Sequence, residues 1–336
     1  MKLSLTEPIT DSLISIKGLS VTFDTPRGLV YALNDVNLEL RNKEAVGIVG
    51  ESGCGKTTLG LSLIGLLPMP PARISSGSIL YRNMNIANLY KKKITSIRGT
   101  EIFMIFQEPM TSLNPVLTIE DQLAEAVKVR AAREDKRSLS KKEIHEELVS
   151  SLESVKISDP ERVLAGYPHQ LSGGMRQRLM ISMALLLKPS LIIADEPTTA
   201  LDVTTQEQIM VLLKELQSKL ETSILFITHD LNLVRSFAQR IVVMYAGEIV
   251  EEGTSEEIIR QPKHPYTQGL VQCIPKIYKS QGNLETIPGT VPDLMETSTS
   301  CKFLPRCKFA FERCKEKPSL YQSADSTRKV RCFLYE

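Results

Sequence analysis

Eight residues near the start of the chain have the types and spacing that bind phosphate. They read Gly50-Glu51-Ser52-Gly53-Cys54-Gly55-Lys56-Thr57, with Thr58 next. Glycines let such a loop fold tightly, so successive backbone N–H groups point at one anion. Lys56 would contact the β- and γ-phosphates of a nucleotide, and Thr57 would give its hydroxyl to Mg²⁺. A glycine-rich turn is the alternative reading of the loop taken alone.

Two acidic residues downstream supply the chemistry that such a loop lacks. Asp195 and Glu196 close the apolar run Leu191-Ile192-Ile193-Ala194. Asp195 would hold the Mg²⁺ shell, and Glu196 would polarise an attacking water. The alternative interpretation is a strand that ends in two solvated acidic residues without a catalytic role. The pairing with a phosphate loop favours a nucleotide site.

The elements that must position these residues belong to an α/β fold. Residues Ala45–Val49 read as a buried strand before the loop, and Thr58–Leu67 as a helix after it. A helix that begins at the loop adds the positive end of its dipole to the anion site. Cys54 reads as a small filler of a variable position. Cys54 also lies beside the helix N-terminus, which could lower the pKa of its thiol and make the thiol reactive.

A third motif opens the helical pattern that runs to Leu187. It reads Leu171-Ser172-Gly173-Gly174-Met175-Arg176-Gln177-Arg178, and its two glycines free backbone N–H groups for a second anion site without a lysine. A lone Ser-Gly-Gly would be a helix cap and turn. In this order and spacing, the run resembles the LSGGQ-type signature of ATP-binding-cassette (ABC) ATPases.

Further positions match the ABC family residue by residue. Gln107 follows the apolar strand Ile102–Phe106, as the family's glutamine does, and the resemblance places it beside the γ-phosphate and Mg²⁺. His229 follows the strand Ile224–Thr228 and matches the switch histidine. Ala200-Leu201-Asp202 matches the D-loop, although Thr199 stands where relatives usually carry serine. Phe23 is the candidate for the aromatic residue that stacks on adenine, and Tyr31 is the alternative. Phe23 could instead be an ordinary core residue.

The resemblance implies a P-loop NTPase of the ABC class over residues 1–260. It would have a RecA-like core, a β subdomain and a helical insertion over about 108–175. The signature residues of one chain, Ser172 and Gly174, would close on ATP bound to another chain. A groove beside Gln107, near Glu108-Pro109-Met110-Thr111, would accept a short helix from a membrane subunit.

Residues 261–336 form an extension that is too long for a frayed end, and we expect it to be a small Cys-rich C-terminal domain. It carries Cys301, Cys307, Cys314 and Cys332. In a reducing compartment, clustered cysteines favour a metal site over disulfides. Their gaps differ from the C-x-x-C spacing of zinc ribbons and bacterial ferredoxins, so spacing alone does not name the metal. A disulfide-stapled tail, or two buried and two exposed thiols, is the alternative.

The extension narrows the resemblance to one subfamily. His264-Pro265-Tyr266-Thr267, the run Ile287–Leu294 and the four cysteines together look like the C-terminal region of oligopeptide and dipeptide importer ATPases, and the residues around the signature resemble the "D" subunit. The resemblance implies a [4Fe–4S] cluster on the four cysteines, with Zn²⁺ as the alternative. The implied partners are a second cassette subunit, most simply a heterodimer, two transmembrane permease subunits and an extracytoplasmic peptide-binding protein.

Composition agrees with this class. The chain has 336 residues and a formal net charge of +2. This charge is too small to indicate a nucleic-acid-binding protein. It shows no signal-like start, and no apolar run approaches the ~20 residues that span a bilayer. We therefore expect a peripheral protein at the cytoplasmic face of the membrane.

Two other classes compete with a peptide importer. One is a soluble ABC ATPase of DNA repair, translation or cluster assembly, and the other is a redox sensor that only binds nucleotide. A single phosphate loop argues against the two-cassette translation type, and Glu196 with His229 argues against an inactive ATPase. Related nickel or oligosaccharide importers remain alternatives for the cargo.

Overall fold

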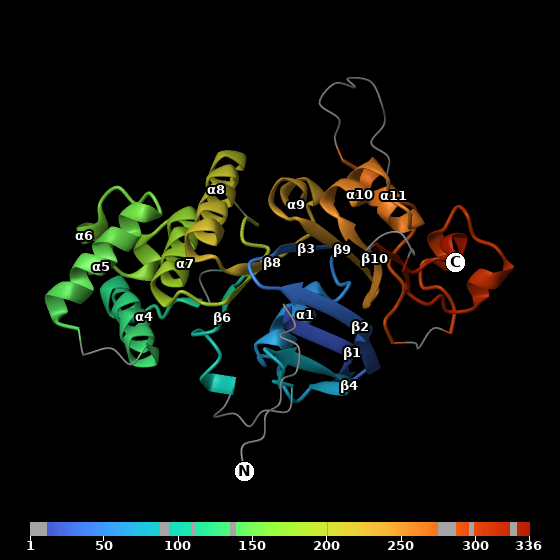
Figure 1. The fold of residues 1–336 in the computed structure, drawn as a ribbon, viewed down its shortest axis with the longest axis horizontal. Helices are drawn as coiled ribbons and strands as arrows, with labels where there is room; N and C mark the ends of the chain where they lie inside the picture. The colour runs from blue at the N-terminus through green and yellow to red at the C-terminus, as the bar shows by residue number, and fades with distance from the viewer. Residues whose placement is uncertain are drawn as a thin grey trace, which may run out of the picture.

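The computed structural model describes residues 12–87, 94–108, 112–134, 139–199, 201–274, 287–295, 299–322 and 328–336. Two sheets organise these residues (Figure 1). The larger sheet has eight strands in the order β11-β12-β10-β9-β3-β8-β7-β6. Their bounds are Tyr321–Gln322, Lys329–Val330, Glu248–Thr254, Arg240–Tyr245, Ala45–Val49, Ser223–Thr228, Leu191–Asp195 and Ile102–Ile105.

The centre of this sheet is parallel and fully buried. β3 pairs in parallel with β8 and β9, and β7 pairs in parallel with β6 and β8. Every residue of β3, β7 and β8 is buried. This explains why the strands read as unbroken apolar runs, as expected for a parallel sheet covered on both faces. Parallel strands end at one common edge, so the residues that follow β3, β6, β7 and β8 meet there.

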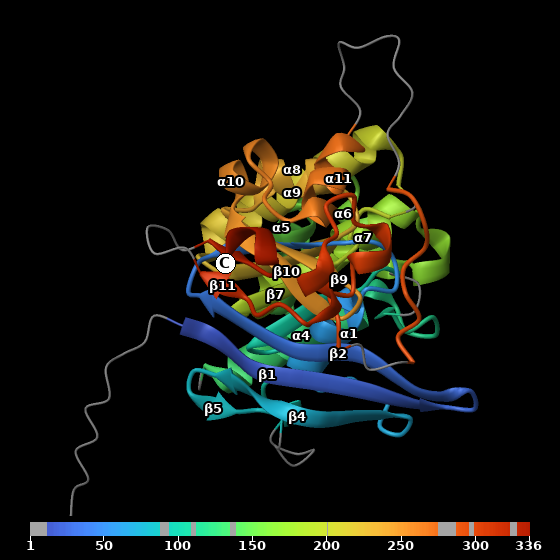
Figure 2. The same ribbon diagram turned by 90° about the vertical axis from the view of Figure 1, so that its right-hand side faces the viewer.

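The smaller sheet is antiparallel and contains long strands. Its order is β2-β1-β4-β5, with bounds Gly28–Arg41, Ser12–Thr25, Ala72–Tyr81 and Met84–Asn85. It lies beside α1 and the parallel sheet (Figures 1 and 2). Apolar residues from both sheets and from α1, among them Leu33, Leu38, Ile48 and Leu59, share one core.

The helices lie on both sides of the parallel sheet. α1 (Lys56–Leu63) follows β3 and α7 (Gly173–Leu187) precedes β7. The remaining helices after β7 are α8 (Val203–Leu220), α9 (Leu231–Phe237), α10 (Ser255–Arg260) and α11 (Pro265–Gln272).

The segment between β6 and β7 is helical, as the sequence predicts. α4 (Ile119–Arg133), α5 (Lys141–Ser154) and α6 (Pro160–Ala165) pack beside α7 in a lobe at one end of the molecule (Figure 1). Thr118, Ser140 and Asp159 cap these helices by accepting hydrogen bonds from backbone N–H groups of the first turn. Their apolar faces, including Leu123, Leu148 and Leu152, join the core that covers the second face of the parallel sheet.

One local expectation was wrong. The sequence of Gly247–Gly253 predicts a small hairpin. Instead, Ala246 and Gly247 form the turn, both with positive φ, and β10 pairs along its length with β9. The hairpin is therefore larger than the sequence suggested, because its first strand reads as an ordinary buried core strand.

The C-terminal extension continues the main sheet. β12 pairs with β10 and β11 pairs with β12, and the short helical turns Leu304–Arg306, Glu312–Lys315 and Phe333–Tyr335 lie outside these strands (Figure 2). We expected a separate small domain. The described part of the extension instead shares hydrogen bonds with the sheet and core contacts through Phe303.

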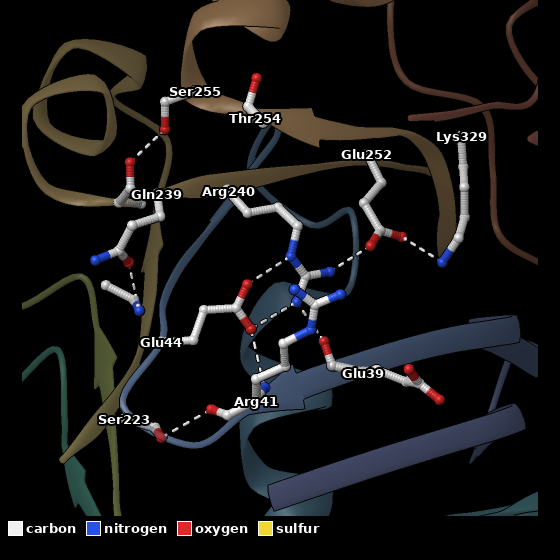
Figure 3. Close-up of polar contacts among 12 residues, drawn as sticks. Glu39, Arg41, Glu44, Ser223, Gln239, Arg240, Glu252, Thr254, Ser255 and Lys329 are labelled. Carbon is white, nitrogen blue, oxygen red and sulfur yellow. Dashed lines mark hydrogen bonds and ion pairs between the residues drawn. The ribbon is translucent and has the colours of Figure 1, made fainter. Parts of the chain in front are cut away.

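Buried ion pairs fasten the extension to β10. Glu252 pairs with Arg240 and, at 3.2 Å, with Lys329 of β12 (Figure 3). The same Arg240 donates to Glu44 before β3, with Nε–Oε1 at 2.8 Å, so the contact continues into the centre of the sheet. Glu251 is fully buried and pairs with Arg328. Buried charges are retained in folds when they are paired in this way.

Candidate nucleotide-binding site

The phosphate loop lies between β3 and α1 and has the expected shape. Gly55 has a φ of 101°, and a Cβ there would stand 2.5 Å from the Ala32 carbonyl oxygen, so only glycine fits. The Lys56 ammonium donates to the carbonyl oxygens of Gly50 at 2.8 Å and Glu51 at 3.0 Å. The lysine thus lies inside the curve of the loop, where a phosphate would compete with these carbonyls for its charge.

Cys54 does not have the environment of a reactive thiol. Its side chain is fully buried and belongs to the core, not to the lining of the pocket. Burial raises the pKa of the thiol, and the nearby Lys56 only partly offsets this. The possibility of a lowered pKa at this helix N-terminus is therefore wrong, because desolvation exceeds the effect of neighbouring charge.

Thr57 and Asp195 meet at the edge of the parallel sheet. The Thr57 hydroxyl donates to Asp195 Oδ1 at 3.2 Å, although 138 residues separate them. Burial raises the pKa of Asp195 to about 6, and the repulsion of Glu196 adds to this. A hydroxyl beside a buried carboxylate is the donor set that suits Mg²⁺. A bound divalent cation would supply the positive charge that the carboxylate lacks here.

Glu196 stands at the centre of a polar cluster. Its carboxylate contacts the His229 ring nitrogen Nδ1 at 3.0 Å, the Thr199 hydroxyl at 2.8 Å and the Gln107 amide nitrogen at 3.3 Å. Burial alone would raise the pKa of Glu196, but hydrogen bonds from His229 and Thr199 hold it below its ordinary value. Glu196 therefore stays ionised and can accept a proton from a bound water.

The backbone of Glu196 is itself unusual. Its φ is 45°, in the left-handed region that non-glycine residues rarely adopt, and its N–H donates to the Ile227 carbonyl at 2.8 Å. Such strain at the end of a core strand is typical of functional positions. It directs the carboxylate toward the side chains that follow β6 and β8.

A pocket of about 810 Å³ joins the phosphate loop to the antiparallel sheet. It includes most of the residues expected at a nucleotide site, while Tyr31, the alternative to Phe23, is not among its lining residues. The lining residues are Phe23, Val30, Ala32, Gly50, Glu51, Ser52, Gly53, Gly55, Lys56, Thr57, Thr58, Gln107, Glu196, Thr199, His229, Leu270 and Leu294.

The signature does not reach this pocket. Among the described residues that line it, none comes from Ser172, Gly173 or Gly174. Ser172 caps α7 by accepting the Met175 N–H at 3.3 Å. A Cβ at Gly174 would stand 2.9 Å from the Thr205 side chain, so the signature packs beside the start of α8. Ala200 of the D-loop and residues 109–111 after Gln107 lie outside the described residues.

The sequence missed that the C-terminal extension touches the phosphate loop. The Glu51 N–H donates to the Tyr266 hydroxyl at 2.8 Å, and the Glu51 carboxylate pairs with Arg306 at 3.0 Å. Leu270 and Leu294 of the extension line the pocket. No local signal reveals these contacts, because more than 200 residues separate the partners. The His264-Pro265-Tyr266-Thr267 run was the single visible hint.

The four tail cysteines line one small apolar pocket between the helical turns of the extension. Its lining includes Cys301, Cys307, Cys314 and Cys332, and each thiol is free. Burial raises the pKa of Cys301 to about 11 and also raises that of Cys332. Within the described ranges, no group of three or more His, Cys, Asp or Glu side chains is arranged to hold a metal ion.

Comparison with known families agrees with the fold and the pocket. The ABC transporter family matches residues 33–199, and the family described as the oligopeptide/dipeptide transporter C-terminal region matches residues 250–314. A dimeric ATP-binding cassette, solved in a post-hydrolysis state bound to ADP and Pi, superposes with a TM-score of 0.63 at 31% identity. It covers 72% of this chain and 98% of its own. The fold and the pocket thus define an ATP-hydrolysing cassette of the ABC class.

Relatives that are similar over nearly the whole chain assign it to one family within the ABC class. The dipeptide transport ATP-binding protein DppD of Bacillus subtilis is 44% identical over 326 residues, 97% of this chain and 96% of its own. The oligopeptide transport ATP-binding protein OppD of Escherichia coli is 45% identical over 316 residues, 94% of this chain and 91% of its own. The chain belongs to this family of ABC transporter ATP-binding subunits. In the described part of the chain, no helix is long and apolar enough to cross a membrane.

Proposed function

We propose that this chain hydrolyses ATP to energise the import of dipeptides or oligopeptides across the cytoplasmic membrane. The observation that supports peptides as the cargo is the match of residues 250–314 to the oligopeptide/dipeptide transporter C-terminal region. The names of the full-length relatives agree with it. As a proposed division, residues 1–260 form the cassette, with its helical subdomain at about 108–175, and residues 261–336 form the extension.

The site residues divide into binding and catalytic groups. Phe23 stacks on the adenine, and the loop from Gly50 to Thr58 holds the phosphates through backbone N–H groups and Lys56. Thr57, Asp195 and Gln107 would hold Mg²⁺, which would supply positive charge to neutralise the phosphates. This assignment rests on the Thr57–Asp195 contact and the place of Gln107 in the pocket.

Glu196 acts as the general base in this proposal. Ionised and partly buried, it takes a proton from the attacking water, while His229 and Gln107 fix its carboxylate through the contacts above. Ser172, Gly173 and Gly174 serve the nucleotide of a second cassette, since they lie outside the pocket of their own chain. Hydrolysis then requires two cassettes.

The proposed partners are those expected for a subunit of this family. A second cassette subunit completes the dimer, most simply as a heterodimer, two permease subunits cross the membrane and an extracytoplasmic protein delivers peptide. The chain then lies at the cytoplasmic face of the membrane. A soluble ABC ATPase is the alternative, and the proposal includes no nucleic-acid partner.

Reconstitution tests the proposal. The chain, assembled in vesicles with its permease subunits and binding protein, should take up defined di- and oligopeptides only with ATP. Glu196→Gln should stop both uptake and hydrolysis. ATP-driven uptake of Ni²⁺ or oligosaccharide in place of peptide would overturn the cargo class while leaving the ATPase assignment intact. Hydrolysis that no added subunit alters would favour a soluble ABC ATPase.

For the extension we infer that Cys301, Cys307, Cys314 and Cys332 hold a [4Fe–4S] cluster. All four side chains line one apolar pocket of the extension, which brings four possible thiolate ligands to one place. Four thiolates are the ligand set of a [4Fe–4S] cube and also of a tetrahedral Zn²⁺ site, and the resemblance to the importer subfamily favours the cube. The cluster would order the helical turns of the extension.

Metal analysis of anaerobically purified protein tests this inference. Brown protein with about four irons per chain is the expected result. One zinc per chain and no colour would keep the ligands and replace the cofactor by Zn²⁺. Disulfides between these cysteines without metal would reject both.

A further inference from the structure

We propose that Leu294 of the C-terminal extension forms a wall of the adenine-binding slot, so the extension contributes directly to binding of the nucleotide base. This inference rests on the proposed ATP site. Leu294 is one of the residues that line the nucleotide pocket, together with Phe23, Val30 and Ala32. The phosphate loop and its lysine occupy another part of the same pocket.

Leu294 lies at the base end of the pocket, not at the phosphate end. Its carbonyl oxygen accepts the Tyr31 N–H at 2.8 Å, which places it beside Val30 and Ala32. Val30 pairs with Phe23 across the β1–β2 ladder. Ala32 in turn approaches Gly55 of the phosphate loop. The order from phosphate to base is therefore Gly55, Ala32 and then Val30 with Phe23 and Leu294.

The chemistry of this end suits a flat aromatic base. Phe23, Val30 and Leu294 are apolar and only partly buried, so each keeps surface for a ligand. A flat base gains dispersion and stacking energy from an aromatic ring and from an aliphatic side chain. Phe23 alone would offer the base one contact, whereas Leu294 gives it a second apolar surface from a separate part of the chain.

The segment that carries Leu294, residues 287–295, is held at both ends. Ile287 packs against α11, because a Cβ at Gly269 would stand 2.8 Å from its Cγ1. The Pro288 carbonyl accepts Arg306 Nε at 2.8 Å. At the other end, Met295 Cε lies 3.1 Å from the position a Cβ would take at Gly28.

These contacts hold Leu294 in position before a nucleotide binds. Met295 also donates its N–H to the Asp293 carboxylate at 3.0 Å, which fixes the turn that has Leu294 at its centre. A side chain that is already in place loses little conformational entropy on binding. The contribution of Leu294 should therefore appear directly in affinity for the base.

Comparison of ATP with inorganic tripolyphosphate isolates the base contact. Isothermal titration on the full-length chain measures both dissociation constants. Leu294→Ala should weaken ATP binding by about five- to tenfold, the value for losing part of a leucine contact. Tripolyphosphate binding should stay unchanged, because that ligand carries no base. Leu294→Met, which keeps an apolar side chain of similar volume, should restore ATP affinity.

A matched leucine controls for general effects on the extension. Leu320 is also partly buried and packs on the core, but it does not line the nucleotide pocket. Leu320→Ala should leave both dissociation constants unchanged, and a loss equal to that of Leu294→Ala would overturn the inference. Equal weakening of ATP and tripolyphosphate by Leu294→Ala would also overturn it, as would no weakening of either. Wild-type protein that binds no ATP would overturn the proposed ATP site as well.

Discussion

At the scale of single residues, the position of Glu196 gives the sharpest test of catalysis. Its carboxylate contacts His229, Thr199 and Gln107, and these partners come from three separate segments. Glu196→Gln keeps the shape and most of these hydrogen bonds but cannot accept a proton. Turnover should fall by about 10²–10⁴-fold, while ATP affinity should stay close to wild type. Single-turnover hydrolysis and equilibrium binding measure the two quantities separately. Full turnover in this variant would contradict the role of Glu196 as base.

Asp195 predicts a pH dependence of metal binding. Its pKa is raised to about 6, chiefly by burial. The protonated acid is a poor Mg²⁺ ligand, so affinity for Mg²⁺·ATP should be full well above pH 6 and fall as pH drops through that value. ATP takes up a proton in a similar range. The measurement is therefore the difference between the binding profiles of wild type and Asp195→Asn. Profiles that run parallel from pH 5 to 8 would rule out titration of Asp195.

At the scale of elements, β10 decides how firmly the extension is attached. Glu251 in this strand is 0% exposed and accepts the N–H groups of Lys263 and His264, both at 2.9 Å, besides its pair with Arg328. Glu251→Gln would leave Arg328 without this carboxylate charge. The free energy of unfolding should drop by about 3–5 kcal/mol, as for other broken buried pairs. Urea denaturation provides the measurement.

Glu256→Gln serves as the matched control for Glu251→Gln. Glu256 pairs with Arg260 in α10, and its side chain is 72% exposed. Exposed helical pairs contribute little, so the same substitution here should change stability by less than about 1 kcal/mol. Equal effects of the two substitutions would show that β10 does not anchor the extension through its buried charge.

At the scale of the whole molecule, the signature lies outside the nucleotide pocket of its own chain. This predicts that each chain binds one nucleotide and contributes its signature to the nucleotide of the other chain. Because Ser172 does not line its own chain's pocket, Ser172→Arg should leave ATP binding by the isolated chain unchanged. The same variant should lose most hydrolysis once the transporter is assembled, since the bulky cation would stand in the partner's site. Weaker ATP binding by the isolated Ser172→Arg chain would place the signature at its own nucleotide and remove the need for a dimer.

The sequence by itself determined the local features of the site. The phosphate loop, the strands that precede it and Asp195, and the helix after Ser172 appear within a residue or a few residues of their expected bounds. Each depends on short-range physics: glycine at positive φ, an apolar run for a buried strand, a serine cap for a helix. The parallel arrangement of those strands then brings Thr57, Asp195, Glu196 and His229 to one edge.

Only the tertiary structure decided what the extension does. The sequence marked its cysteines and prolines but placed them in a separate small domain. In the fold, Arg306 contacts Glu51, Leu294 lines the nucleotide pocket and β12 joins the main sheet. The partners in these contacts lie roughly 80 to 270 residues apart, and each is an ordinary residue type in its own segment. Their meeting depends on long-range packing and on the pairing of buried charges, which no spacing within the sequence encodes.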